Sequence, residues 1–331
     1  SVLKDAGLEF STPETPNPLD MFTEKYFHSK RGFRHLWELA KDPKLKISIP
    51  MGFITFSKKE SIEAAYWFLT RKKDFVLKIN EGSQGIGIAL FNYKDFPDDK
   101  KAFEQKLATF IAEDVWNQSC IVVEEKADVD KAMFGGSPNV ELRILKDGRV
   151  VREYGCEQVL DKDGKTFRGV AIHKGVVSSK YIKTAFKAAE LFGTKLSYYG
   201  YRGVFDMDLV VSKSGELFAV ESNLRRTGGT HIHEFCTTLL GKNYWNKHYV
   251  VAYELTLDEG KTPEEKAKLH RDYVTVSKLL EPIKYDHSKK RGVMFVNPDL
   301  LEVGVLSLLV VGKNKVEVGG FLNTISKIST R

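Results

Sequence analysis

Cysteine and long apolar runs are both scarce in this chain of 331 residues. Its three cysteines, Cys120, Cys156 and Cys236, lie far apart and form neither a CxxC pair nor the dense pattern of a disulfide-stabilised secreted domain. The most apolar run, Val303–Val311, has nine residues, whereas a helix needs about 20 to cross a bilayer. We therefore expect a cytoplasmic protein that has no membrane partner.

The sequence also lacks a secretion signal, internal repeats and low-complexity tracts. Residues 1–20 are polar, contain three prolines and include no apolar core segment. The net charge is +7, but lysine and arginine are spread along the chain, which argues against a nucleic-acid partner. The charge fits a mildly basic surface, or an enzyme that handles phosphates and acidic small molecules.

Hydrophobic periodicity predicts a mixture of helices and antiparallel hairpins. Helices are expected within residues 29–42, 57–73, 98–114 and 178–193, with Gly193 ending the last, and near Thr262–His270. Strand pairs are expected within residues 74–91, 140–159 and 201–223, and a short β-like tail within 291–312. Hairpins without regular βαβ alternation indicate the α+β class.

The segment "KINEGSQGIG" places Lys78 at the end of an apolar strand, ahead of a glycine-rich loop. Glycines let backbone N–H groups approach a polyanion, and the lysine adds a point charge on phosphate oxygens. The lysine precedes the glycines and the loop precedes a strand, so neither a Walker A loop nor a dinucleotide fingerprint fits. A phosphate-covering flap and an ordinary glycine-rich hairpin both remain open.

The hairpin within residues 201–223 carries oxygen side chains on otherwise apolar strands. If its turn is symmetric about residues 213–214, Asp206 lies opposite Glu221, with Asp208 as a diagonal neighbour. Asn223 follows on the face of Glu221. Such an oxygen-only set suits Mg²⁺, which also bridges to nucleotide phosphates. The alternative is a solvated polar face. The apolar residues that flank these side chains argue against it.

Two adjacent arginines follow this hairpin in "NLRRTGGTH". A guanidinium of Arg225 or Arg226 is suited to bind a carboxylate or a phosphoryl group through two parallel hydrogen bonds. For one of the two, a surface ion pair is an equally good interpretation. Residues 227–230 then offer backbone N–H groups before a helix that begins near His231, and a helix N-terminus favours an anion.

The order and spacing of these segments over Met21–Tyr253 resemble the ATP-grasp superfamily. The resemblance implies an ATP-grasp fold of two α+β lobes that clasp ATP, with a small C-terminal β-rich extension. Its domains would be residues 1–20 (a lead-in), 21–127 (the N-lobe), 128–257 (the C-lobe) and 258–331 (the extension). The family carries a Rossmann-like domain of about a hundred residues ahead of the ATP domain. We expect residues 1–20 to be its remnant, with the rest truncated or supplied elsewhere.

The resemblance also assigns the ATP-binding residues. Lys30 in "HSKRGF" matches the early family lysine, Lys78 matches the strand lysine, and "VVEEKAD" matches the hinge strand that contacts adenine. The implied nucleotide contacts are Lys30, Lys78, Ser83, Gln84, Gly85, Glu124, the backbone of Lys126 and Ala127, and, for ribose or phosphate, Asn139, Glu141 and Arg143.

The family's E-x-N-x-R motif corresponds to "ESNLR". The motif puts Asp208, Glu221 and Asn223 at the metal positions, with Asp206 as second choice because the hairpin geometry favours it. The tail "ESNLRRTGGTH" is most similar to the pheganomycin-type peptide ligases. An ATP- and Mg²⁺-dependent carboxylate–amine ligase that forms an acyl phosphate is implied, with Arg225, Arg226 and Lys78 as catalytic residues.

The implied substrates are an amino acid, a peptide or another carboxylic acid, together with an amine. Arg168, His173 and Lys174 in "FRGVAIHKG" are either substrate contacts or ordinary surface-loop residues. The sequence leaves a homodimer open. Two alternative functions are an ATP-grasp kinase that phosphorylates a small molecule and a nucleotide-binding module without catalysis.

Overall fold

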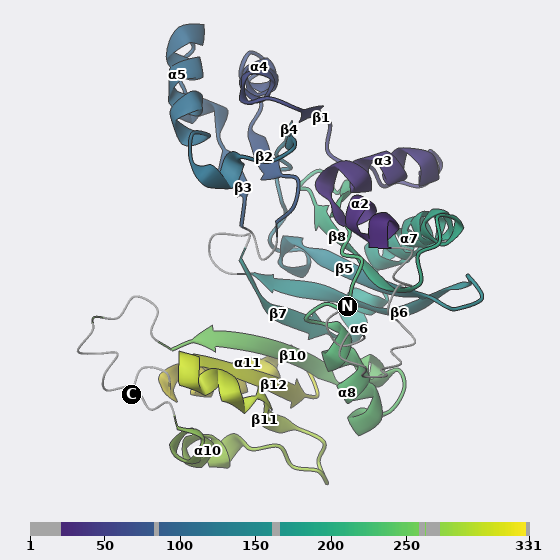
Figure 1. Cartoon of the computed structure of the whole chain (residues 1–331). Helices are drawn as coiled ribbons and strands as arrows, with labels where there is room; N and C mark the ends of the chain where they lie inside the picture. The colour runs from purple at the N-terminus through teal and green to yellow at the C-terminus, as the bar shows by residue number, and fades with distance from the viewer. Residues whose placement is uncertain (1–20, 83–85, 161–165, 258–261, 263–271, 329–331) are drawn as a thin grey trace, which may run out of the picture. The chain divides into compact units, whose positions relative to one another are not determined.

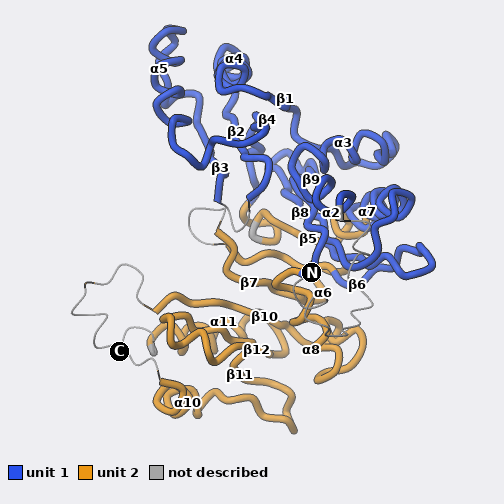
Figure 2. The backbone as a smooth tube through the Cα atoms, viewed as in Figure 1, with its two compact units in different colours: residues 1–130, 140–154, 184–226 blue, residues 131–139, 155–183, 227–331 orange. Residues whose placement is uncertain are grey.

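A computed structural model describes residues 21–82, 86–160, 166–257, 262 and 272–328 (Figure 1). The chain divides into two compact units (Figure 2): unit 1 comprises residues 1–130, 140–154 and 184–226, and unit 2 comprises 131–139, 155–183 and 227–331. Strands β5 (Pro138–Ile144) and β6 (Val150–Leu160) contribute residues to both. The predicted α+β class is confirmed. The predicted helix near Thr262–His270 lies outside the described residues, apart from Thr262 itself.

Unit 1 contains an antiparallel four-stranded sheet of order β1-β4-β2-β3. Its strands are β1 (Gly52–Thr55), β2 (Phe75–Ile79), β3 (Ile88–Phe91) and β4 (Ile121–Glu125). Helices α4 (Lys58–Leu69) and α5 (Lys100–Phe110) pack on it through a core that includes Phe68, Phe75 and Phe103. Ser57 caps α4 by accepting a hydrogen bond from the Glu60 N–H, as predicted. The strand–loop–strand prediction around Lys78 is likewise confirmed by the β2–β3 ladder.

Helices α2 (Met21–His28) and α3 (Lys30–Ala40) of unit 1 approach each other closely. The predicted apolar face of α3, which includes Phe33, Leu36 and Trp37, is buried. The Ser29 side chain caps α3 by accepting from the Gly32 N–H at 3.0 Å. A Cβ atom at Gly32 would lie 1.8 Å from the Tyr26 carbonyl oxygen, so only glycine fits this junction.

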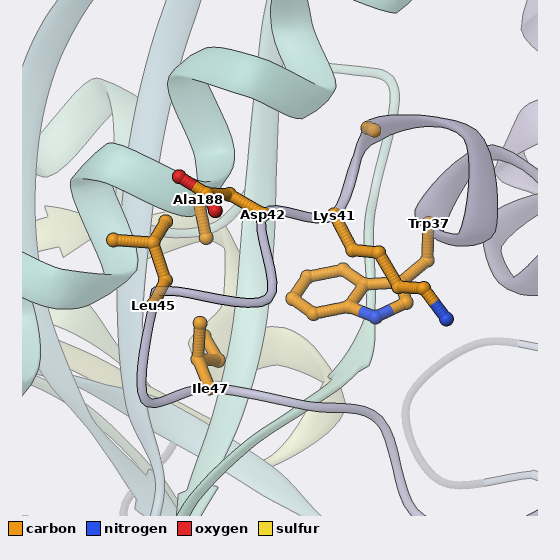
Figure 3. A pocket seen from close by; sticks show the side chains of 7 residues that line it. Trp37, Lys41, Asp42, Leu45, Ile47 and Ala188 are labelled. Carbon is orange, nitrogen blue, oxygen red and sulfur yellow. The ribbon is translucent and has the colours of Figure 1, made fainter.

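The C-terminal end of α3 borders a pocket together with α7 (Lys180–Tyr198). Figure 3 shows a small, mostly apolar pocket here, lined by Trp37, Ala40, Lys41, Asp42, Leu45, Ile47 and Ala188. The prediction that Gly193 ends this helix is wrong, because α7 continues through it. A Cβ atom at Gly193 would lie 2.7 Å from Phe205 Cζ, so the glycine serves close packing and not a helix cap.

Unit 2 contains antiparallel strands in the order β11-β12-β10-β7-β6. The predicted C-terminal strands are β11 (Gly292–Asn297) and β12 (Val305–Gly312); β12 pairs with β10 (Tyr249–Thr256), which pairs with β7 (Phe167–Ile172). The helices are α6 (Lys174–Val177), α8 (Thr230–Leu240), α10 (Tyr273–Leu280) and α11 (Lys315–Ile328). Helices α10 and α11 were not predicted from the sequence, and their apolar faces join the core beside β12.

Short 3-10 helices connect many of these elements: η2 (Tyr93–Asp95), η3 (Asp114–Trp116), η4 (Phe134–Gly136), η5 (Tyr244–Asn246), η6 (Glu281–Ile283) and η7 (Pro298–Val303). None of the described helices combines the length and the apolar character needed to cross a bilayer. All three cysteines are buried and unbridged.

The α2–α3 junction gives a prediction about stability. Gly32→Ala should lower the free energy of unfolding by about 3 kcal/mol, because the new methyl group collides with backbone that cannot move cheaply. Gly320→Ala in α11 is the matched control, since nothing lies within 4 Å of a Cβ atom there. It should raise stability by about 0.5 to 1 kcal/mol through helix propensity. Equal effects in denaturant unfolding would contradict this view of the junction.

Candidate active site

The site is built around the hairpin of β8 (Gly203–Val211) and β9 (Leu217–Glu221) in unit 1. The turn is centred on Ser214: the Ser212 N–H donates to the Glu216 carbonyl, and Gly215 has a φ of 82°. A three-residue loop with glycine in the left-handed region is a common hairpin connection. From this turn the register runs regularly through Val211↔Leu217 to Leu209↔Ala219.

A β-bulge then changes the register, so that Asp208 pairs with Glu221 and Val220 is the extra residue. The Asp206 N–H donates to the Asn223 carbonyl, which places that pair next along the ladder. The expectation that Asp206 lies opposite Glu221 is therefore wrong. The bulge moves Glu221 off the buried face of Ala219 and onto the face of Asp208.

Asn223 links the two aspartates. Its backbone N–H donates to Asp206 Oδ1 at 2.8 Å, and its Nδ2 donates to Asp206 Oδ1 at 3.0 Å and to Asp208 Oδ2 at 3.1 Å. Asp206 is only 3% exposed, whereas Asp208 is half-buried. Asp206 therefore holds the Asn223 segment in place, and Asp208 is the more accessible carboxylate beside Glu221.

Lys30 reaches this hairpin from the first turn of α3. Its ammonium forms an ion pair with Glu221 Oε1, and the lysine side chain is 6% exposed. The start of α3 is fixed by Asn80, which follows β2: its carbonyl accepts from the Lys30 N–H at 2.9 Å and its Oδ1 from the Arg31 N–H at 3.1 Å. The end of β2 thus determines where the Lys30 side chain begins.

Lys78 on β2 reaches the same hairpin from the four-stranded sheet. Its ammonium pairs with Glu124 Oε1 of β4 and also donates to the Val220 carbonyl at 3.4 Å. Arg34 of α3 donates to Glu124 Oε2 at 2.9 Å and to the Pro50 carbonyl at 2.8 Å. Both Glu124 oxygens thus accept from cations, the buried Lys78 and the half-buried Arg34, and the bulge residue presents its carbonyl to Lys78.

His28 and Arg225 complete this cluster. The Leu224 N–H donates to His28 Nδ1 at 3.2 Å, while Arg225 is exposed and its Nη2 lies 3.4 Å from Asn223 Oδ1. Burial lowers the pKa of His28, and the Arg225 guanidinium lowers it further. His28, Arg34 and Asn80 were not predicted from the sequence. Arg34 carried a signal, because it lies four residues after Lys30 on one helix face.

Solved structures share this architecture at low sequence identity. Biotin carboxylase from Campylobacter jejuni matches with a TM-score of 0.62 at 11% identity, covering 98% of this chain and 69% of that chain. N5-carboxyaminoimidazole synthase from Aspergillus clavatus, solved with ADP and a ribonucleotide, matches with 0.60 at 11% identity, covering 99% and 79%. Phosphoribosylamine–glycine ligase from Thermotoga maritima matches with 0.53 at 15% identity, covering 93% and 78%.

The chain has the ATP-grasp fold. A curated protein similar in sequence is L-propargylglycine–L-glutamate ligase of Streptantibioticus cattleyicolor, which is 33% identical over 119 residues. The match covers 30% of this chain and 24% of that ligase, so about three-quarters of the relative's length is not matched. No protein-family model matches the chain. The resemblance predicted from the sequence, to ATP-grasp enzymes and to an amino-acid ligase, is confirmed.

Other residues that the ATP-grasp resemblance assigned to nucleotide have structural partners of their own. The Lys126 N–H donates to the Asp74 carbonyl at 3.0 Å, and Arg143 Nε donates to Glu153 at 2.6 Å. Glu141 is fully buried and accepts from the Tyr154 hydroxyl at 3.4 Å. Asn139 is buried in unit 2, Ala127 is half-buried after β4, and Arg226 is exposed after Arg225. Ser83, Gln84 and Gly85 lie outside the described residues.

The expected substrate residues lie in unit 2. His173 stacks on Tyr249 with ring centroids 4.2 Å apart, and both point a polar atom at Glu157 Oε1, at 3.3 Å and 3.1 Å. Arg168 donates to Thr256 Oγ1 at 2.8 Å, and Lys174 is exposed at the start of α6. His173 therefore belongs to an ordered polar cluster, while Lys174 lies on the surface.

The buried charges of this cluster give a prediction. Glu124→Gln leaves Lys78 and Arg34 without a counter-charge, so the free energy of unfolding should fall by about 3 kcal/mol. The neighbouring Glu125 pairs with Lys73, and both side chains are about a third or more exposed. Glu125→Gln should therefore cost less than about 1 kcal/mol. Similar losses for both variants in denaturant unfolding would contradict the importance of the buried pairs.

Proposed function

We propose that this chain is an ATP-dependent carboxylate–amine ligase. The observation that carries the proposal is the cluster in unit 1 on an ATP-grasp fold. Lys30 pairs with Glu221, Lys78 donates to the adjacent Val220 carbonyl, and Arg225 lies beside Asn223 at the same end of the hairpin. The curated relative supports the class of reaction, because its name specifies two amino acids and a ligase. The proposed substrates are an amino acid, a peptide or another carboxylic acid, and an amine.

Lys30 and Lys78 would bind the phosphates of ATP. Both ammonium groups are held against carboxylate oxygens, which are anionic acceptors of the same kind as phosphate oxygens. Glu124 would act by holding Lys78 in place, since its Oε1 pairs with Lys78 and its Oε2 accepts from Arg34. The Lys126 carbonyl and the Ala127 N–H are our proposed adenine contacts. The remaining proposed contacts are Ser83, Gln84 and Gly85 to phosphate, and Asn139, Glu141 and Arg143 to ribose or phosphate.

Asp208, Glu221 and Asn223 would hold Mg²⁺. Among the described residues no group of three or more His, Cys, Asp or Glu has the spacing to hold a metal ion, so the set is two carboxylates and an amide. The composition fits a hard cation, because all three side chains carry oxygen and the bulge puts them at one end of the hairpin. The Asn223 amide, whose nitrogen faces Asp208 in this structure, would turn its oxygen to the ion. Bound there, Mg²⁺ would neutralise phosphate charge during transfer. Asp206 would position Asn223.

The reaction we propose has two steps. An oxygen of the substrate carboxylate attacks the γ-phosphorus, the bond to the β–γ bridging oxygen breaks, and ADP leaves with that electron pair. The amine then attacks the acyl carbon, phosphate leaves with the former carboxylate oxygen, and the nitrogen loses a proton. Lys78 and Arg225 would stabilise charge on the transferring phosphoryl group. Arg226 would bind the substrate carboxylate, and Arg168, His173 and Lys174 would contact the substrate.

The test is a screen for ADP release over amino acids and small acids, each with and without an amine. The proposal predicts ADP, free phosphate and a new amide only when acid and amine are both present. ADP with a phosphorylated substrate would instead identify a kinase. Tight ATP binding without amine-dependent ADP release would identify a nucleotide-binding module.

Glu221→Gln gives the sharpest prediction for the active site. It removes the partner of Lys30 and a metal ligand, so ADP release should fall at least about a thousandfold while the protein stays folded. Glu216→Gln is the control, because this exposed residue lies at the turn of the same hairpin. Undiminished turnover by the Glu221 variant would overturn the assignment.

Substitutions of Asp206 and Asp208 should have different effects on metal dependence and on stability. Asp208→Asn should raise the Mg²⁺ concentration needed for half-maximal activity by about tenfold or more, with little change in thermal stability. Asp206→Asn should lower stability, because Asp206 is buried and accepts two hydrogen bonds from Asn223. Magnesium titrations and thermal melts check both. The reverse pattern would make Asp206 the metal ligand.

A further inference from the structure

His28 is the last residue of α2 and lies one residue before the Ser29 cap of α3. Its imidazole Nδ1 accepts a hydrogen bond from the Leu224 backbone N–H at 3.2 Å. Leu224 stands between Asn223 and Arg225, the proposed metal ligand and the proposed phosphoryl-binding arginine. The Leu224 side chain is 1% exposed, so it anchors the chain at this point.

Two links therefore join the same two segments of unit 1. The Lys30–Glu221 ion pair connects their side chains, and the His28–Leu224 hydrogen bond fixes the backbone three residues further on. The His28–Leu224 hydrogen bond holds the residue directly before Arg225. The exposed Arg225 side chain has no buried carboxylate among its described partners. The direction of the Arg225 side chain thus depends on the backbone that His28 holds.

The donor in this hydrogen bond is a backbone N–H, so Nδ1 must be the acceptor and the proton must sit on Nε2. The surrounding charges agree with a neutral ring. Burial and Arg225 lower the pKa of His28, as does Lys30, whereas Glu221 and Glu81 raise it, and the net shift is downward. Protonation of Nδ1 would break the bond to Leu224 and set a cation beside Arg225.

We propose that His28 is a positioning residue that binds the Leu224 N–H and thereby directs Arg225 toward the transferring phosphoryl group. The inference rests on the proposed ligase function and adds to it a residue that does not touch substrate. Small displacements of such a group are costly, since a misplacement of about 1 Å can reduce a rate about a hundredfold.

The chain offers a matched pair of variants. Asparagine places its Oδ1 near the position of the imidazole Nδ1, whereas glutamine places its amide near Nε2. His28→Asn should therefore keep kcat within about threefold, and His28→Gln and His28→Leu should lower kcat about tenfold to a hundredfold. The KM for ATP should change by less than about threefold in all three, because Lys30 and Lys78 are untouched.

The pH profile separates positioning from a general structural role. The folded state lowers the pKa of His28, so the hydrogen bond is fully present above the ordinary value of about 6.5 and is lost as the pH falls through the lowered folded value. Wild-type kcat should fall in that window, whereas His28→Asn should not, since its amide does not titrate. Equal kcat for the Asn and Gln variants would overturn the proposal.

Nuclear magnetic resonance gives a readout that does not depend on the ligase reaction. Ring ¹⁵N shifts should show His28 neutral with the proton on Nε2 at pH 7, and the Leu224 amide resonance should move in His28→Gln but little in His28→Asn. A proton on Nδ1 in the folded protein would overturn the proposal for His28. A wild-type chain with this tautomer but without amine-dependent ADP release would instead overturn the proposed ligase function.

Discussion

Neutralisation of buried charge is the constraint on which unit 1 depends. The side chains of Lys30, Lys78 and Glu124 are less than a tenth exposed, and an unpaired charge at such depth would cost several kcal/mol. Each forms an ion pair with a residue on another element. Lys30 pairs with β9, Lys78 pairs with β4, and Glu124 pairs with both β2 and α3. The elements that carry these charges must therefore come together in one arrangement.

Under the proposed function, the same pairs would prepare the site for a polyanion. Cations already fixed by packing and by hydrogen bonds need little reorganisation when an anion approaches, and such preorganisation is a large part of catalytic stabilisation. Lys30 illustrates this, because Asn80 fixes its backbone and Glu221 its ammonium. The cost is stability, since buried ion pairs commonly contribute less to folding than apolar residues of equal size would.

Much of this arrangement could be predicted from the sequence. The face of α3, the strands around Lys78 and the hairpin that carries Glu221 all followed from periodicity and turn residues. The register of that hairpin did not, because alternation assumes a regular ladder and nothing in "ELFAVESN" marks Val220 as a bulge. The prediction that Gly193 ends α7 failed for a related reason. A glycine that ends a helix and a glycine that packs against Phe205 cannot be told apart from the sequence.

Contacts between distant segments were the other limit. His28 and Leu224 are 196 residues apart, and Arg34 and Glu124 are 90 apart, so no local pattern joins them. Arg34 could have been suspected from its spacing to Lys30, whereas His28 carried no signal at all. The family motif groups Asp208 with Glu221, and the structure pairs these two residues across the hairpin, whereas strict alternation pairs Asp206 with Glu221.

The most direct test of the central claim follows one oxygen atom. Once an acid substrate is known, its carboxylate is labelled with ¹⁸O and the released phosphate is examined by ³¹P nuclear magnetic resonance. An acyl-phosphate ligase transfers one labelled oxygen from the carboxylate to phosphate in each turnover, and the proposed mechanism predicts that isotope-shifted signal. Phosphate without the label, formed at the same rate as the amide, would contradict it.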